Sequence, residues 1–260
     1  MNWNSVKYEL LESGIALITL NRPDFLNALD DGMREDFKNL TPILAKENVK
    51  AIVFTGEGKA FCAGGDISHF EKKWNADNFT KQSRVVSDFY DFLEDLPKPV
   101  FAAMNGVATG AGLQLAMACD VRVVATEAKA GFREHQLNLI PSHGGTYRLV
   151  KLLGLSKAKH FYLSQRLASS NELLRMGFVS HVVESKGLLE FVLNWAKALV
   201  ARAPMATGEA IKLLNSMTDT DRDSALEREY KSQTKMLLSK DHKEGVRAFR
   251  EKRKPFFKGE

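Results

Sequence analysis

Short apolar runs alternate with longer amphipathic segments along the first two thirds of the chain. The runs predict strands at residues 6–11, 15–20, 49–55, 100–104 and 121–125. The segments with apolar residues at helical spacing predict helices at residues 30–46, 77–96 and 111–118. The first two runs are joined by Ser13 and Gly14, which predicts a hairpin. Strands that alternate with helices indicate an α/β layered core.

From about residue 186 onward the pattern is entirely helical. Apolar positions mark three successive amphipathic faces, which include Val192 in the first, Ile211 in the second and Tyr230 in the third. These faces hold more apolar side chains than a lone helical hairpin could bury. We therefore expect this part to pack on the core or on neighbouring chains.

The composition is that of an ordinary globular protein, with 44% hydrophobic residues among 260. The most apolar stretch, near residues 99–118, is interrupted by Asn105, several glycines and Gln114, so it predicts no membrane span. Two cysteines provide no disulfide framework, and the first residues have no apolar leader segment, so we expect a cytoplasmic location. The net charge of +5 favours polyanionic partners such as CoA or RNA.

Two glycine-bearing turns carry the candidate chemistry. They lie at residues 61–66 and 105–112, and each follows a predicted strand and opens into a helix-like segment. Glycine lets the backbone turn sharply and leaves peptide N–H groups uncovered. The first amides of a helix are unpaired and carry the positive end of its dipole. Two such ends brought together would stabilise a negative oxygen, so the pattern predicts an enolate-like anion as the intermediate.

These turns resemble those of the crotonase family, also called the enoyl-CoA hydratase/isomerase family. Further matches follow in the family's order at residues 21–23, 26–29, 140–141, 144–146, 148–149 and 251–255. The resemblance implies an α/β crotonase-like core of repeated β-β-α units over residues 1–190. It also implies a C-terminal helical oligomerisation region over residues 191–260 that forms a homotrimer or a hexamer.

By this resemblance, the Gly65 and Ala111 N–H groups form the oxyanion hole. Hydratases of the family use two glutamates, and the corresponding positions here hold Gln114 and Glu134. An amide can orient water or a carbonyl group, but it cannot exchange a proton at neutral pH. One carboxylate therefore remains, and it predicts a single-base proton shuttle.

Double-bond isomerisation of an enoyl-CoA is accordingly slightly favoured over hydration. In the alternative, an enoyl-CoA or dienoyl-CoA hydratase would use Gln114 to position water, and hydrolysis or decarboxylation of an unusual acyl-CoA comes third. A basic RNA-binding protein with the crotonase fold is the alternative from another class, but a nucleic-acid partner is the less favoured one.

The remaining candidate residues concern the substrate, an acyl-CoA, and the resemblance implies no further cofactor. It assigns substrate or CoA contacts to Phe25, Leu26, Gly64, Asp66, Ile67 and Gly110, to which we add His143 because an imidazole there could act as an acid or bind a polar acyl group. Asp24 replaces a basic residue common at its position in the family, so one phosphate contact is in doubt. The histidines and cysteines lack the spacing of metal ligands.

Overall fold

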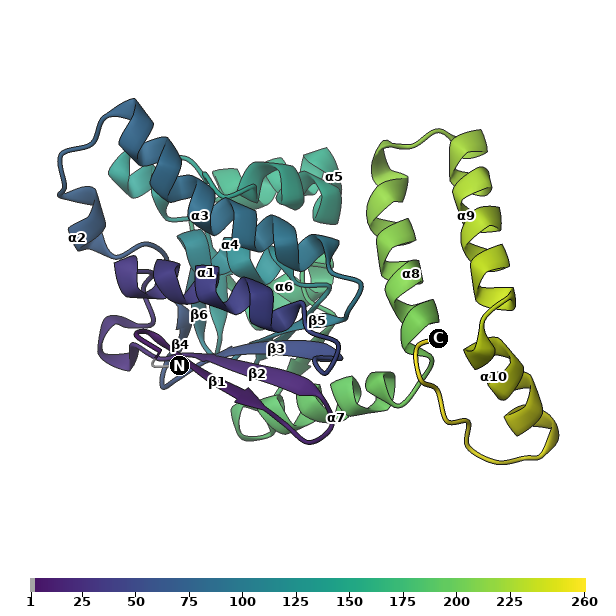
Figure 1. Ribbon diagram of the computed structural model, residues 1–260. Helices are drawn as coiled ribbons and strands as arrows, with labels where there is room; N and C mark the ends of the chain where they lie inside the picture. The colour runs from purple at the N-terminus through teal and green to yellow at the C-terminus, as the bar shows by residue number, and fades with distance from the viewer. Residues whose placement is uncertain (1–2) are drawn as a thin grey trace.

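Two β-sheets with helices packed against them form the main body of the protein (Figure 1). The computed structural model describes residues 3–260, and all side chains among them except that of residue 219. One sheet has the strand order β1-β2-β3-β5-β7-β10 and the other has the order β4-β6-β8-β9. The strands are β1 Val6–Leu10, β2 Ile15–Leu20, β3 Ala51–Gly56, β4 Ala60–Cys62, β5 Val100–Met104, β6 Val107–Thr109, β7 Val121–Ala125, β8 Lys129–Gly131, β9 Ala168–Ser169 and β10 His181–Val183. The α-helices are α1 Asp31–Leu44, α2 Ile67–Phe70, α3 Ala76–Asp95, α4 Gly110–Ala118, α5 Gly145–Leu163, α6 Ser170–Met176, α7 Leu188–Val200, α8 Pro204–Ser216, α9 Arg222–Leu237 and α10 Lys240–Arg250.

The predicted repeat of β-β-α units is confirmed. The pairs β3/β4, β5/β6 and β7/β8 each contribute one strand to each sheet, and helices follow each pair. In the larger sheet, β3 and β5 pair in parallel, as do β5 and β7. In the smaller sheet, β4 and β6 are also parallel. Because the carboxyl ends of parallel strands meet at one edge of a sheet, the two glycine turns that follow β4 and β6 lie side by side.

The predicted hairpin and the first helix are also confirmed, since β1 and β2 pair in antiparallel register. Helix α1 begins after Asp30, whose side chain accepts a hydrogen bond from the Met33 N–H at 2.7 Å and so caps the helix. The apolar stripe of α1 packs on α3, where the rings of Phe37 and Phe89 stack with centroids 4.5 Å apart. On α3 the buried face includes Val86 and Tyr90, while Val85 is only half-buried.

Helix α4 packs on β4, β6 and β8 of the smaller sheet and on α3 and α5, and every residue after Gly110 is buried. Gly112 lies against β4, where a Cβ atom at this position would be 2.3 Å from the Cys62 carbonyl oxygen. The absence of a side chain at Gly112 therefore sets how closely the second glycine turn approaches the first.

Gly112→Ala is expected to lower the free energy of unfolding by about 1–3 kcal/mol, because the added methyl group must displace backbone. Urea denaturation followed by circular dichroism measures this change. Gly187→Ala is the matched control, since the nearest atom to a Cβ there is Val183 Cγ1 at 3.9 Å. Equal destabilisation by the two substitutions would contradict the close-packing role of Gly112.

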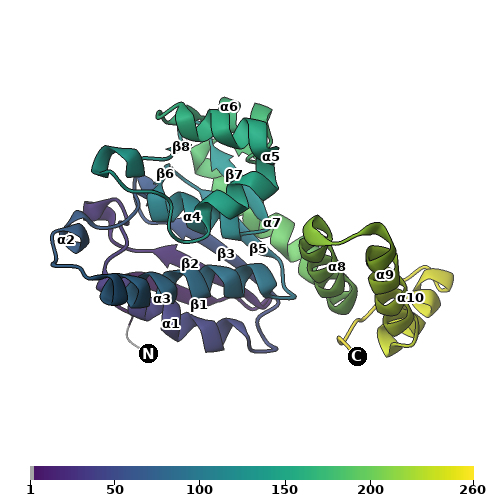
Figure 2. The ribbon, with the colours of Figure 1, turned by 90° about the horizontal axis from the view of Figure 1, so that it is seen from above.

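The C-terminal helices divide into one that covers the core and three that extend from it. Helix α7 packs on β3, β5 and β7 of the larger sheet. Helices α8, α9 and α10 form an appendage beside the core (Figures 1 and 2). None of the helices between residues 3 and 260 combines the length and apolar character needed to cross a bilayer.

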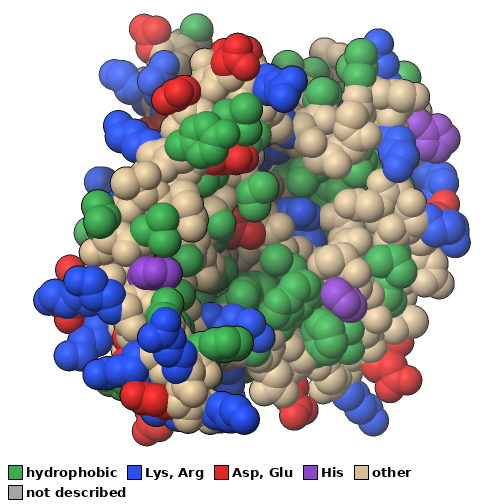
Figure 3. Space-filling view, turned by 90° about the vertical axis from the view of Figure 1, so that its right-hand side faces the viewer, with side chains coloured by type: hydrophobic (Ala, Val, Ile, Leu, Met, Phe, Trp, Pro, Cys, Tyr) green, Lys and Arg blue, Asp and Glu red, His purple; other side chains and the backbone are tan. Residues whose placement is uncertain are grey.

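The appendage exposes large apolar side chains. Leu238, Phe249 and Phe256 are 76%, 85% and 73% exposed. Figure 3 shows this side of the molecule, where hydrophobic side chains gather around a hollow and charged side chains surround them. Apolar side chains exposed in this way are typical of surfaces that bind another molecule.

Candidate active site

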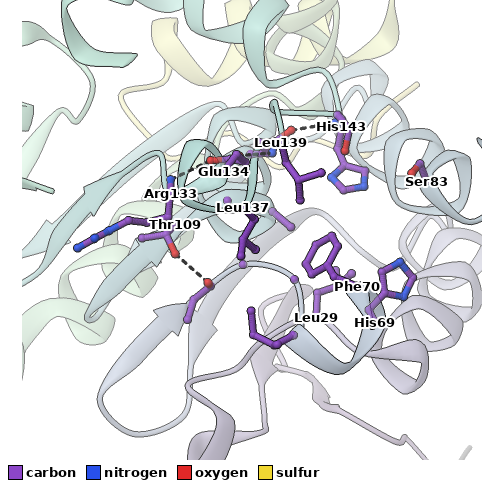
Figure 4. A pocket seen from close by; sticks show the side chains of 18 of the residues that line it. Leu29, His69, Phe70, Ser83, Thr109, Arg133, Glu134, Leu137, Leu139 and His143 are labelled. Atoms are coloured by element: carbon purple, nitrogen blue, oxygen red, sulfur yellow. Dashed lines mark hydrogen bonds between the residues drawn. The ribbon is translucent and has the colours of Figure 1, made fainter. Parts of the chain in front are cut away.

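A cavity of about 230 Å³ lies where the two glycine turns meet. Its lining includes residues from both turns, from the start of α4 and from the segment that follows β8. Figure 4 shows that apolar side chains, among them Leu29, Phe70, Leu137 and Leu139, occupy much of the wall. A concave, mostly apolar site with a few polar groups is typical of small-molecule binding.

The N–H group of Gly65 points away from Leu29, the residue that forms a β-bridge with Gly65. Gly65 forms a parallel bridge with Leu29, in which the Leu29 N–H donates to the Gly64 carbonyl and the Asp66 N–H donates to the Leu29 carbonyl. In such a bridge, the N–H and C=O groups of Gly65 itself face the opposite side. Since Gly65 also lines the cavity, its N–H is free to serve a ligand there.

The N–H group of Ala111 lies in the first turn of α4, where helical amides have no partner within the helix. The two turns touch each other. A Cβ atom on Gly110 would be 3.3 Å from Gly64 Cα, and the Thr109 hydroxyl donates to the Ala63 carbonyl at 2.8 Å. This contact holds the two amide-bearing turns together as parts of one cavity wall.

Glu134 provides a carboxylate to the same cavity. It begins a short 3-10 helix, Glu134–Leu137, and its Oε1 atom is 4.0 Å from the position that a Cβ on Gly110 would take. Partial burial raises the pKa of the Glu134 carboxyl above its usual value, although hydrogen bonds, including one from the Arg133 N–H, act in the opposite direction. A carboxyl group with a raised pKa is suited to both accepting and donating a proton.

Gln114 lies on α4, one turn beyond Ala111, and is only 2% exposed. Its Nε2 atom donates to Glu134 Oε1 at 3.1 Å, and its Oε1 atom accepts from the His143 N–H at 2.8 Å. Both polar atoms of the amide are thus held by hydrogen bonds. Because the His143 N–H needs an acceptor, the NH₂ group is the one that faces Glu134. Gln114 orients the carboxylate, and its amide cannot transfer a proton at neutral pH.

The structure brings together most of the residues that the sequence pointed to. The cavity is lined by Glu134, Gly65, Ala111, Gln114, Gly64, Ile67, Gly110 and His143. Three predicted contact residues lie outside this lining, namely Phe25, Leu26 and Asp66. The first two are 60% and 43% exposed, and Asp66 caps α2 and forms an ion pair with Arg22 at 2.9 Å.

Arg34 and His69 also line the cavity, and neither of them is among the site residues predicted from the sequence. Arg34 occurs on the apolar stripe of α1, directly after Met33 and one turn before Phe37. A charged residue on a predicted buried face was the available signal, because such a residue is rarely buried without a partner. Within residues 3–260, no cluster of three or more His, Cys, Asp or Glu side chains is arranged to hold a metal ion.

Proteins similar to this chain are known. The family described as enoyl-CoA hydratase/isomerase matches residues 11–260. A short-chain-enoyl-CoA hydratase from Clostridium acetobutylicum is 36% identical, over 98% of this chain and 97% of its own. The mitochondrial methylglutaconyl-CoA hydratase of Mus musculus is 34% identical, over 95% of this chain and 80% of its own.

Among solved structures, the enoyl-CoA hydratase from Bacillus anthracis superimposes with a TM-score of 0.94 at 32% identity, and 99% of this chain and 100% of that one are covered. The fold is therefore the crotonase fold, with two sheets and C-terminal helices. The chain belongs to the enoyl-CoA hydratase/isomerase family, whose enzymes act on acyl-CoA thioesters.

Proposed function

We propose that this enzyme moves the double bond of a 3-enoyl-CoA to the 2-position, with Glu134 as the only group that transfers protons. The observation that carries the proposal is the fixed pair of side chains in the cavity. Glu134 is the single carboxylate of the lining, and Gln114, at the place of a second acid, donates a hydrogen bond to it.

In the proposed reaction, Glu134 takes the proton from Cα of the thioester. The electron pair of that C–H bond moves onto the thioester oxygen, where the Gly65 and Ala111 N–H groups stabilise the negative charge. The electrons then return through the conjugated system as Cγ takes the proton from Glu134. The double bond shifts from Cβ–Cγ to Cα–Cβ, and the carboxylate is regenerated without any other reactant.

Hydration of a 2-enoyl-CoA is the second candidate, and the names of relatives such as the hydratase from Clostridium acetobutylicum favour it. In that reaction, the water oxygen adds to Cβ and one water proton reaches Cα. Glu134 would then handle both proton movements, while Gln114 helps to position the water. The two candidates use the same oxyanion hole and differ in whether water becomes part of the product.

Incubation with 2-enoyl-CoA and 3-enoyl-CoA in heavy water separates the two candidates. Deuterium incorporated at Cα or Cγ without a hydroxyl product supports isomerisation. A 3-hydroxyacyl-CoA product as the main species would instead assign the enzyme to hydration.

Gln114→Glu is expected to raise the rate of 2-enoyl-CoA hydration, because it restores a second carboxylate. The new carboxylate would lie beside Glu134, whose Oε1 atom is 3.1 Å from Gln114 Nε2. Two carboxylates at this distance share a proton, so one of them becomes an acid at neutral pH. Steady-state hydration kinetics of both proteins measure the change. Gln114→Leu, which adds no acid, is the control, and a Gln114→Glu variant without any gain would leave the hydratase comparison unsupported.

We also propose that the protein assembles as a homotrimer or a hexamer through its C-terminal helices. The exposed apolar side chains of α9, α10 and the following segment support this proposal, because a second copy would cover them. Light scattering coupled to size-exclusion chromatography is expected to give three or six times the mass of one chain. Phe249→Glu should lower that mass, and a monomer for the unaltered protein would contradict the proposal.

A further inference from the structure

Three side chains with nitrogen donors lie at one part of the cavity. Some of their nitrogen atoms have no hydrogen-bond partner in the described chain. Arg34 comes from α1, His69 from α2 and His143 from the segment before α5, and all three line the cavity. Figure 4 shows His69 and His143 toward one end of the pocket and Glu134 toward the other, with Phe70 and Leu137 between them.

The guanidinium of Arg34 is only partly neutralised. Its residue is 8% exposed, and its Nη1 atom donates to Asp31 Oδ1 at 3.0 Å. This bond to Asp31 is the one hydrogen bond that the structure gives the guanidinium among residues 3–260. Asp31 also pairs with Lys72 at 2.5 Å, so two cations share one carboxylate. Arg34, Lys72 and Asp31 together therefore carry a surplus positive charge. A buried cation without full compensation attracts an anion into the site.

The two imidazoles are neutral at pH 7. Burial first, and then the positive charge of Arg34, lower the pKa of His69 and of His143 to about 4. Asp31 and Asp66 act in the opposite direction on His69, whereas Lys72 adds to the lowering. His69 and Arg148 lower the pKa of His143 further. Each ring therefore has one N–H donor and one acceptor nitrogen.

The buried nitrogen of each ring is Nδ1, and neither Nδ1 has a hydrogen-bond partner in the described chain. The distance from His69 Nδ1 to Asp31 Oδ1 is 3.7 Å, too long for a hydrogen bond. A buried unpaired N–H is rarer than a buried unpaired lone pair, so the proton belongs on Nε2 in both rings. Nε2 is the other nitrogen of each ring, and both residues line the cavity, so each Nε2–H is placed to donate to a ligand there.

Acceptors are scarce on this part of the wall. Glu134 is the single carboxylate among the lining residues, and its oxygens are already hydrogen-bonded to Gln114 and to the Arg133 N–H. The cavity wall between Glu134 and the two histidines is apolar, with Leu29, Phe70 and other hydrocarbon side chains. Such a pocket suits an acyl chain that is apolar in the middle and carries an acceptor group at its far end.

We propose that the acyl group of the substrate ends in a carboxylate, which binds Arg34 together with His69 and His143. The substrate class is thus the CoA half-thioester of an unsaturated dicarboxylic acid. This inference rests on the proposed function, in that the thioester occupies the oxyanion hole while the second carboxylate lies at the other end of the cavity. Charge-assisted hydrogen bonds from a guanidinium are stronger than those between neutral groups, so Arg34 contributes most of the recognition.

Binding of saturated, unreactive thioesters tests the inference apart from turnover. Isothermal titration calorimetry would compare succinyl-, glutaryl-, adipyl- and pimelyl-CoA with the methyl-ended butyryl-, valeryl-, hexanoyl- and heptanoyl-CoA. At the chain length that reaches Arg34, the dicarboxylic thioester is expected to bind at least about tenfold more tightly than its methyl-ended counterpart. The terminal amide of the same length is expected to bind less tightly than the acid.

Arg34→Met should abolish the preference for the acid without weakening the methyl-ended thioester, and Arg34→Lys should retain part of the preference. Lys38→Met is the matched control, because Lys38 lies one turn further along α1, is exposed to solvent and does not line the cavity. A purely structural role of Arg34 would weaken both kinds of thioester alike.

Equal or tighter binding of the methyl-ended thioester at every length overturns the inference and leaves the proposed function intact. A terminal amide that binds as tightly as the acid also overturns it, since the site would then recognise polarity and not charge. Failure of every thioester to bind overturns the placement of the thioester itself, and this inference with it.

Discussion

Glu134→Gln is expected to lower kcat by about 10²–10⁴-fold, because the amide cannot take up or release a proton. Binding of an unreactive acyl-CoA should change little, since the Gly65 and Ala111 N–H groups and the apolar wall remain. Stopped assays of enoyl-CoA conversion measure the first quantity, and calorimetry measures the second. The substitution replaces the carboxylate that lines the cavity and accepts a hydrogen bond from Gln114.

The pH profile gives an independent test of the same role. Glu134 must be ionised to remove the Cα proton, and burial raises its pKa above the usual glutamate value. As the pH is lowered, activity should therefore begin to fall at a higher pH than it would with an ordinary glutamate. Activity should be retained at pH values above the raised pKa. Glu57→Gln is the control, because this glutamate pairs with Lys7 on the surface outside the cavity. Normal turnover by the Glu134→Gln enzyme would remove Glu134 from the mechanism.

Loss of the Ala111 N–H is expected to lower kcat/KM by about 10²–10³-fold, the usual effect of removing one oxyanion-hole donor. Ala111→Pro removes this N–H in the first turn of α4, where proline is compatible with a helix. Replacing the peptide bond before residue 111 by an ester removes the same N–H without adding a ring to a site that is only 5% exposed.

The control for the ester is the same replacement at residue 115, in the middle of α4. That change removes a hydrogen bond of the helix and should lower the melting temperature, but it should leave the catalytic rate of the folded enzyme nearly unchanged. If the two esters slowed the reaction equally, the Ala111 amide would have a structural role only.

Much of the core could be predicted from local patterns. The strands at residues 100–104 and 121–125 have the predicted bounds, and the helices at residues 31–44 and 76–95 begin and end within two residues of the predicted ones. Apolar spacing carries this information, since each element must bury one face or, in a parallel sheet, both faces. Local pattern does not decide everything on α3, where the adjacent residues Val85 and Val86 have the same side chain and only tertiary packing makes Val86 buried and Val85 half-buried.

The candidate site was only partly predictable. The resemblance pointed to Gly65, Ala111, Gln114 and Glu134, and all four line one cavity. It did not reveal that the Gln114 amide bonds to Glu134 on one side and to the His143 N–H on the other. Those contacts join α4 to two later loops, and no periodic pattern encodes the distance between segments that are 20 and 29 residues apart.

The sequence by itself determined the alternating elements, the two glycine turns and the presence of a glutamine at position 114 and a glutamate at position 134. These are properties of short segments, and local sterics, helix dipoles and apolar spacing decide them. Only the tertiary structure decided that Arg34, His69 and His143 share a cavity with Glu134. Their meeting depends on the parallel pairing of β4 with β6 and on the docking of α1 against α3, which are long-range packing events that burial of the whole core selects.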